Sequence, residues 1–443
     1  MNKLKLMIGF VSVCTGMIML PAYALDLSLS DATSMIVTES HDLKKADANL
    51  KKAEASLDAA NANRWFKLDG SVSYMNLVNI EDPTKSKTID LPPSMGGLIS
   101  ESLKDQAVSL PIPDNIFQAG ISVTQPIYTF GKIGNAVKSV KSAIKMADAS
   151  KEMTLREVKY AAAQLYWTAK MTDEIVKLSK QDLANARSAK KSLTSAGRAN
   201  RSNLLKIESD IASKEINVSD AEFNRDTAHR MLKIMAGIDV NESLVLTDDF
   251  PQQFADLNAG ELKTTPQWEI LGEQVKMYEN LARSKRANAY PTLAATANYS
   301  YMTLSEDVDT MFDARGSQSA YWGLAVQMPI FSGGLNRANA TIEAMNAISA
   351  QQDLEQAKKI TTEQYNNAVK QYDRLRGNLE TLVKARDLAA QTYKLSQNRF
   401  ASGQTSAVEL ADVSAGLYQL DIALLSTKYN ILMSAESVKK LGE

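Results

Sequence analysis

One long segment occurs twice in this 443-residue chain, with corresponding positions about 203 to 225 residues apart. Each copy runs from an extended stretch through a loop to a second extended stretch, a proline, a glycine turn and a very long helical stretch. Pro126 and Gly131 of the first copy correspond to Pro329 and Gly334 of the second, where Gly333 precedes the turn. A duplicated strand pair joined to such long helices restricts the fold more than any local motif does.

The first 24 residues have the pattern of an export signal. A positive region around Lys3 precedes an apolar run of about 15 residues, and Ala22 and Ala24 supply the small side chains that precede a cleavage site. We therefore expect residues 1–24 to be a signal peptide, removed before Leu25. A membrane anchor is the alternative, although the apolar run is short for a span of about 20 residues.

Composition argues against several classes of protein. Cys14, the only cysteine, lies in the expected signal, where lipid modification is an alternative, so the rest of the chain has no disulfide. No later apolar run reaches the roughly 18 residues of a transmembrane helix. The net charge of −1 argues against a nucleic-acid partner. His41 and His229 have no metal-ligand spacing, so we expect surface histidines, no metal, no cofactor and no enzyme.

Alternation of apolar and polar residues predicts four strands, and long stretches without Pro or Gly predict helices. Pro126 is expected to end sheet pairing, because proline cannot donate to a ladder. The first structural repeat, 25–263, and the second, 264–443, each hold one strand pair. The strands are expected at about 66–78, 116–128, 292–303 and 319–330. The helices are expected at about 30–64 without a break, 133–195, 200–236, 266–288, 335–400 and 406–440.

The second strand of each pair has one apolar face and one small or polar face, in the same register in both copies. The apolar positions are Phe117, Ala119, Ile121 and Val123, matched by Ala320, Trp322, Leu324 and Val326. Such a sheet suits a barrel with lipid outside and water inside, and a soluble sandwich is the alternative. Four strands leave two open edges, so closure needs two or three chains. The narrow apolar seams of the long helices suit a closed ring with a lumen, or else a coiled-coil rod.

Several short stretches, in their order and duplication, resemble the TolC-type outer-membrane efflux proteins over essentially the whole chain after residue 24. They are residues 27–32, the Pro-Ile-Tyr/Phe turns at 126 and 329, residues 265–267 and residues 400–403. The resemblance implies a mainly α protein with a β-barrel contribution. Three chains would form a twelve-stranded outer-membrane barrel continuous with a twelve-helix periplasmic tunnel. The protein would lie in the outer membrane of a Gram-negative bacterium, in contact with its lipid, with most of its mass in the periplasm.

The resemblance also implies a function. The trimer would be the passive exit duct of a tripartite efflux or type I secretion system, receiving substrates from a periplasmic adaptor (a membrane fusion protein) and an inner-membrane transporter. A periplasmic adaptor or a structural coiled-coil protein of an envelope-spanning complex is the alternative. Adaptors, however, usually have one helical hairpin flanked by small β domains.

The candidate site follows from the same resemblance. In the family, acidic residues at the periplasmic aperture form rings that bind cations and control gating. The matching positions are Glu409 and Asp412, six and nine residues after Gly403, on one face of a helix. Three copies of each would make two carboxylate rings in a cation-selective constriction. The alternative is an ordinary solvated helix face.

The chain departs from the family pattern at two neighbouring aperture positions. The first repeat has Asn203 six residues after Gly197, where an acid would be equivalent, and Thr405 replaces the arginine that locks some closed family members. We therefore expect the closed state to depend on packing. The loops at 79–115 and 303–318 are expected outside the cell, and the turns near Gly197 and Gly403 in the periplasm.

Overall fold

The computed structural model describes residues 25–76, 115–195, 200–257, 259–305 and 316–442. The expected signal, most of the two expected extracellular loops and the turn at Gly197 lie outside these residues. The chain divides into two compact units. Among the described residues, unit 1 comprises 25–50, 147–270 and 353–442, and unit 2 comprises 51–146 and 271–352.

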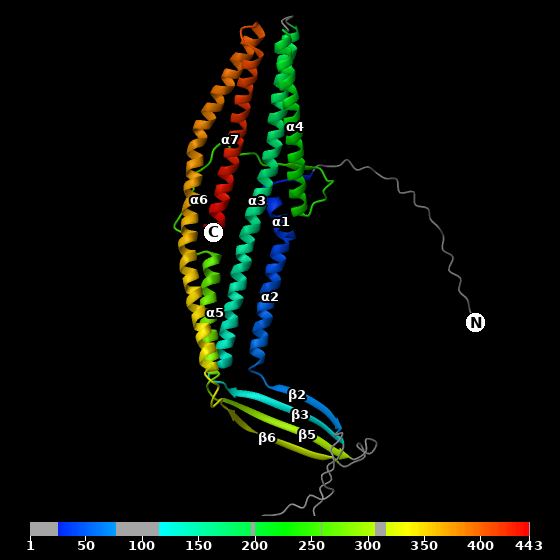
Figure 1. Ribbon diagram of the computed structural model, residues 1–443, viewed down its shortest axis with the longest axis vertical. Coiled ribbons are helices and arrows are strands. Elements are labelled where there is room, and N and C mark those ends of the chain that lie inside the picture. The colour runs from blue at the N-terminus through cyan, green and yellow to red at the C-terminus, as the bar shows by residue number, and fades with distance from the viewer. Residues whose placement is uncertain (1–24, 77–114, 196–199, 258, 306–315, 443) are drawn as a thin grey trace, which may run out of the picture. The chain divides into compact units, whose positions relative to one another are not determined.

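Seven helices account for most of the described chain (Figure 1). They are α1 (Leu29–Glu39), α2 (His41–Ala62), α3 (Lys132–Ser195), α4 (Arg201–Ala236), α5 (Pro266–Ala287), α6 (Leu335–Ser402) and α7 (Ala407–Gly442). The two longest, α3 with 64 residues and α6 with 68, are each a single helix. At 1.5 Å per residue, α6 is about 100 Å long.

The expectation of one unbroken helix over 30–64 is wrong, because the chain leaves the helix at Ser40. Ser40 has φ −54° and ψ 116°, which separates α1 from α2. Its hydroxyl oxygen accepts a hydrogen bond from the Leu43 N–H at 3.3 Å, so this serine caps the start of α2. Ser28 caps α1 in the same way, accepting from the Asp31 N–H at 3.2 Å. Serine at these positions satisfies backbone donors that a helix start leaves unpaired.

The core of unit 1 forms where two three-residue strands lie against the helices. β1 (Leu25–Leu27) pairs in parallel with β4 (Leu244–Leu246), in a part of the chain for which the sequence predicts no element. Tyr166 of α3 is fully buried beside them. Its hydroxyl donates to the Asp248 carboxylate at 2.8 Å and lies 3.1 Å from the Leu27 carbonyl oxygen. Burial raises the pKa of Tyr166 to about 12, so this hydroxyl keeps its proton at physiological pH.

Unit 2 contains an antiparallel sheet of four strands in the order β2-β3-β5-β6. The strands are β2 (Lys67–Asn76), β3 (Asn115–Tyr128), β5 (Thr292–Ser305) and β6 (Ser317–Gln327). The two strand pairs of the sequence repeat are thus adjacent in one sheet, joined by the β3–β5 pairing. β2 and β6 each have one edge without a partner strand among the described residues.

The expectation that Pro126 ends sheet pairing is also wrong. β3 continues to Tyr128, and Pro126 lies opposite Ala294 of β5, with a register shift just beyond it. The pairing of β3 with β2 ends at Thr124, so β3 has β5 as its only partner at Pro126. Proline is tolerated at such an open side, because no ladder hydrogen bond needs its missing N–H.

Both routes from the sheet into a long helix use left-handed backbone. Before α3, Phe130 and Gly131 have φ of 48° and 85°, and before α6, Gly333 and Gly334 have φ of 59° and 83°. Three of these four residues are glycines, which adopt this conformation without a steric penalty. Phe130 is the one non-glycine residue among the described ones to do so.

The register of the sheet separates its two faces along every row. One row of paired positions across the four strands is apolar and consists of Leu68, Val123, Ala297 and Trp322. The adjacent row, on the other face, consists of Asp69, Ser122, Asn298 and Tyr321. The apolar face is not covered by the helices of the same chain, since Trp322 is 86% exposed and Val72 73% exposed. A soluble sandwich formed within one chain would bury this face, so its exposure argues against that form of the alternative.

Candidate functional site

The candidate site lies in unit 1, where the α3–α4 and α6–α7 hairpins end (Figure 1). α6 terminates through Gly403, whose φ is 82°, and the Gln404 N–H donates to the Arg399 carbonyl at 2.8 Å. The Ser406 hydroxyl oxygen then accepts from the Glu409 N–H at 3.2 Å, which makes Ser406 the N-cap of α7. A sharp turn between two capped helices therefore holds this end of the hairpin.

Glu409 occupies the third position of α7, and Asp412 follows one turn later on the same face. Both residues are exposed in the single chain, and neither carboxylate has a hydrogen-bond or ion-pair partner among the described residues. A glutamate three positions after a serine N-cap has the spacing of a capping box, although its carboxylate makes no return hydrogen bond to Ser406 among the described residues. Its negative charge still favours a helix start. Sequence reasoning missed this favourable charge at the helix start, although the Ser-x-x-Glu spacing indicates it.

Asn203 occupies the equivalent position of α4. Asn200 caps that helix, accepting from the Ser202 N–H at 3.1 Å. Asn203 is therefore the third residue of α4, as Glu409 is of α7, so the two copies of the repeat start their second helices in the same way. Thr405, in the α6–α7 turn, is half-buried, and Gly197 lies outside the described residues.

The two hairpins pack against each other through apolar side chains close to these turns. The cluster comprises Leu193 of α3, Ile207 of α4, Phe400 of α6, and Ala407 and Leu410 of α7. All five are buried, and Ala407 is only 1% exposed. All four helices of the two hairpins thus contribute to one apolar contact.

A buried polar contact, here called the Asp182 strut, also joins the two hairpins. Asp182 of α3 accepts hydrogen bonds from the Lys214 ammonium of α4 at 2.5 Å and from the Ser414 hydroxyl of α7 at 2.8 Å. The side chains of Lys214 and Asp182 are 7% and 10% exposed. Nothing in the sequence signals this contact, since Lys214 and Ser414 lie 32 and 232 residues from Asp182.

Two groups beside the Asp182 strut titrate away from their ordinary range. Burial raises the pKa of Asp210, although Lys214, 3.8 Å away, opposes this effect. Burial also raises the pKa of Tyr393 of α6. The surroundings of the Asp182 strut are thus poorly solvated, so a charged side chain there needs a partner of opposite charge.

The expectation of a surface position for His229 is wrong. Its side chain is only 16% exposed, and Nε2 lies 2.9 Å from the Asp173 carboxylate. In the part of the chain that the structure describes, no group of three or more His, Cys, Asp or Glu side chains is placed to hold a metal ion. The described helices include none that is long and apolar enough to cross a membrane.

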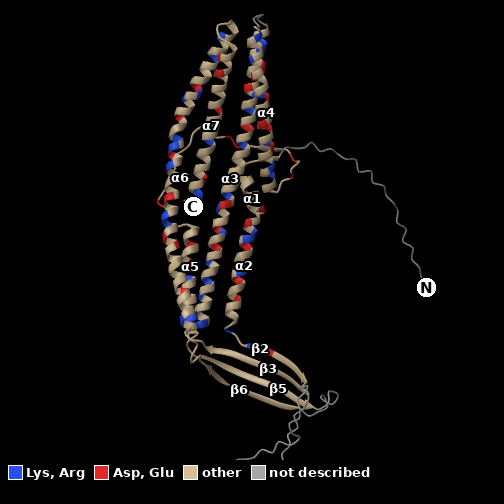
Figure 2. Cartoon of the chain, in the orientation of Figure 1, with Lys and Arg blue, Asp and Glu red and all other residues tan. Residues whose placement is uncertain are grey.

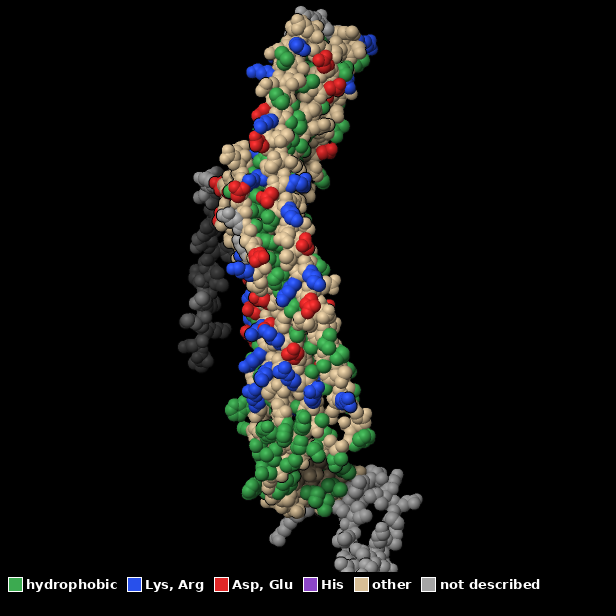
Figure 3. Space-filling view, turned by 90° about the vertical axis from the view of Figure 1, so that its left-hand side faces the viewer, with side chains coloured by type: hydrophobic (Ala, Val, Ile, Leu, Met, Phe, Trp, Pro, Cys, Tyr) green, Lys and Arg blue, Asp and Glu red, His purple; other side chains and the backbone are tan. Residues whose placement is uncertain are grey.

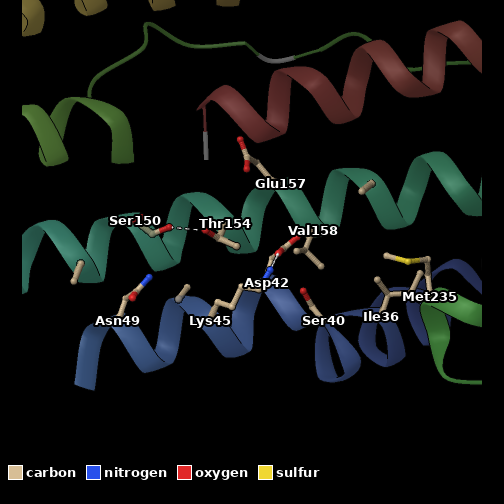
Figure 4. A pocket seen from close by; sticks show the side chains of 13 residues that line it. Ile36, Ser40, Asp42, Lys45, Asn49, Ser150, Thr154, Glu157, Val158 and Met235 are labelled. Atoms are coloured by element: carbon tan, nitrogen blue, oxygen red, sulfur yellow. Dashed lines mark hydrogen bonds and ion pairs between the residues drawn. The ribbon is translucent and has the colours of Figure 1, made fainter. Parts of the chain in front are cut away.

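A groove of about 460 Å³ lies between α3 and the α1–α2 segment (Figure 4). Its charged side chains include Asp42 and Lys45, which pair with each other at 3.3 Å. The Thr154 hydroxyl donates to the Ser150 carbonyl of its own helix at 2.9 Å. These groups satisfy one another locally, so we assign the groove no binding role.

The family match and the fold place the chain in the class of outer-membrane efflux channels. The chain belongs to the outer membrane efflux protein family, whose model matches residues 33–237 and 274–441. The resemblance to TolC-type proteins is thereby confirmed, as is location in the outer membrane of a Gram-negative bacterium. No curated protein matches the chain at the level of sequence.

Solved channels share the fold at low sequence identity. The CmeC outer membrane channel of Campylobacter jejuni superposes with a TM-score of 0.76 and 18% identity, over 93% of this chain and 85% of that one. The outer membrane protein VceC of Vibrio cholerae gives 0.75 and 16%, over 94% and 96%. CusC gives 0.75 and 16%, over 95% and 93%. The predicted mainly α fold with a β contribution is therefore confirmed.

Proposed function

We propose that three copies of this chain form a closed duct. Three four-stranded sheets would supply the twelve strands of an outer-membrane barrel, and the long helices would supply a periplasmic tunnel. The observation that supports this is the sheet itself, which has one apolar face, one polar face and two unpaired edges among the described residues. Lipid on one face, water on the other and strands from neighbouring chains at both edges would satisfy all three features.

The duct would be the passive exit of a tripartite efflux or type I secretion system. It would receive substrate from a periplasmic adaptor and an inner-membrane transporter, which would supply the energy. The sequence has no glycine-rich phosphate loop that could bind a nucleotide, so we propose no enzymatic activity. The duplicated strand pairs and the family match favour a channel over the alternative of an adaptor or a coiled-coil scaffold.

Arginine placed on the two faces of β6 tests this assembly. Leu324 lies on the apolar face and its neighbour Ala325 on the polar face, and both are exposed in the single chain. An arginine facing lipid costs about 2–4 kcal/mol near the bilayer midplane. Leu324→Arg should therefore lose the trimer band of unheated outer-membrane fractions on SDS gels, whereas Ala325→Arg should keep the band and change channel conductance. Equal tolerance of both variants would contradict lipid on the apolar face.

A further inference from the structure

The helix ends that flank the sheet in unit 2 carry a concentration of positive charge, here called the basic collar. It comprises the Lys and Arg side chains of residues 59–68, 129–142, 280–291 and 328–340. These segments hold nine Lys and Arg residues and no Asp or Glu, in a chain whose net charge is −1. In Figure 2, Lys and Arg positions, coloured blue, gather at the ends of α3, α5 and α6 nearest the sheet.

Most of the basic collar is not neutralised within the chain. Lys132, Lys138, Lys141 and Arg337 are exposed, and none has an acidic partner among the described residues. Among the described residues, the collar forms one ion pair, between Arg283 and Glu279 of its own helix at 3.6 Å, and both side chains are at least half exposed. The collar therefore presents uncompensated charge to its surroundings.

Helix stability accounts for only part of the collar. Lys285 and Arg286 lie in the last turn of α5, where positive charge favours a helix. Lys132 and Arg337, by contrast, lie in the first turns of α3 and α6, where it is unfavourable, and neither first turn has an acidic residue. These two cations need another explanation, such as an anionic partner.

Exposed aromatic and aliphatic side chains lie between the collar and the apolar face of the sheet. Trp65 is 68% exposed, and Ile330 and Phe331 are 92% and 89% exposed. Phe130 stacks on Tyr290, with ring centroids 5.8 Å apart. Figure 3 shows Lys and Arg gathered directly beside an apolar region on one face of the molecule. The chain thus has an apolar surface, then aromatic side chains, then cations. This order matches the layers of a bilayer, in which the acyl chains are followed by the interface and then by the headgroup phosphates.

We propose that the basic collar binds the headgroup phosphates of anionic phospholipids in the membrane leaflet that faces the long helices. Lysine and arginine form charge-assisted hydrogen bonds to phosphate oxygens, and the neighbouring apolar side chains lie at the level of the acyl chains. The proposal rests on the proposed membrane placement of the sheet. Each cation that reaches the headgroup layer should raise the relative affinity for an anionic lipid roughly fivefold.

Two variants of equal charge change test the collar. K132Q/K138Q/K141Q/R337Q removes four collar cations, and K358Q/K359Q/K370Q/K394Q removes four exposed lysines of α6 outside it. Trimers are placed in nanodiscs of equal phosphatidylglycerol and phosphatidylcholine, and the lipids that they retain are counted by native mass spectrometry. The wild type and the α6 variant should retain phosphatidylglycerol preferentially, and the collar variant should lose most of that preference.

An unchanged preference in the collar variant, or an equal loss in the α6 variant, would overturn the proposal. So would a collar variant with unchanged lipid preference but altered ion selectivity, because its cations would then face the lumen. Should the fourfold variant fail to form trimers, K138Q/K141Q is measured against K358Q/K359Q with the same criteria. If instead the proposed membrane placement of the sheet is wrong, the Leu324→Arg and Ala325→Arg variants should behave alike. This outcome distinguishes failure of the membrane placement from failure of the lipid-binding proposal.

Discussion

At the scale of single residues, substitutions can separate the proposed aperture role of Glu409 from a contribution to the start of α7. Glutamine keeps the hydrogen-bonding capacity of a capping box but removes the charge, whereas alanine removes both. We expect Glu409→Gln with Asp412→Asn to lower cation selectivity and weaken block by divalent or trivalent cations in single-channel recordings. In a trimer the two residues would place six carboxylates in two narrow layers, where like charges repel unless cations enter.

The control for this pair of substitutions is the stability of the first turn of α7. Glu409→Ala should loosen the start of α7, measured by hydrogen exchange, and the Gln and Asn pair should leave it protected. If the charge-neutral pair conducts and is blocked like the wild type, the two carboxylates do not face the lumen. They would then belong to an ordinary solvated helix face.

Asp210 gives a prediction about pH. Burial raises its pKa in the folded protein above the value of about 3.9 in an unfolded chain. Its ionised form therefore lowers stability above the folded pKa, and this cost disappears as the pH falls to the unfolded value. We expect Asp210→Asn to raise the thermal midpoint at pH 7, with the difference gone near pH 4. Asp220→Asn, at an exposed position of the same helix, is the control for loss of a carboxylate.

At the scale of helices and strands, the Asp182 strut and the apolar cluster hold the hairpins together. Asp182→Asn would leave the buried Lys214 ammonium without its nearest carboxylate, which costs about 3–5 kcal/mol in comparable buried pairs. Ser414→Ala removes only one hydrogen bond to the carboxylate, worth about 1.5–3 kcal/mol. We therefore expect faster hydrogen exchange in α4 and α7 near the strut for Asp182→Asn and a smaller change for Ser414→Ala. Similar exchange in Asp182→Asn and wild type would contradict a structural role for this ion pair.

Sequence analysis predicted the helices and strands whose residue pattern is visible within the segment itself. Strand alternation and long stretches free of Pro and Gly predict the sheet and α3, α4, α6 and α7. The break at Ser40 was missed because it depends on one side-chain hydrogen bond, and the continuation of β3 past Pro126 depends on where β2 stops pairing. The Asp182 strut has no local signal at all, because its partners meet only in the folded chain.

At the scale of the whole molecule, the orientation in the membrane follows from chain connectivity. β6 begins at Ser317 and leads through Gln327 into α6, which ends at Ser402 beside the hairpin turn. If the hairpin ends face the periplasm, Ser317→Cys should react with a membrane-impermeant maleimide on intact cells. Ser402→Cys should react only after the outer membrane is permeabilised. The reverse pattern would contradict this orientation.

The parallel pairing of β1 with β4 has a consequence for folding. Leu25 pairs with Leu244, about 219 residues away, so β1 has no partner until that length of chain has crossed the inner membrane. Closing so long a loop is slow, because its entropy must be lost before any contact compensates. Until then Leu27, Ile36 and Tyr166, all fully buried in the folded protein, stay exposed on the emerging chain. We therefore expect the newly exported polypeptide to depend on a periplasmic chaperone that shields its first half while the second half arrives.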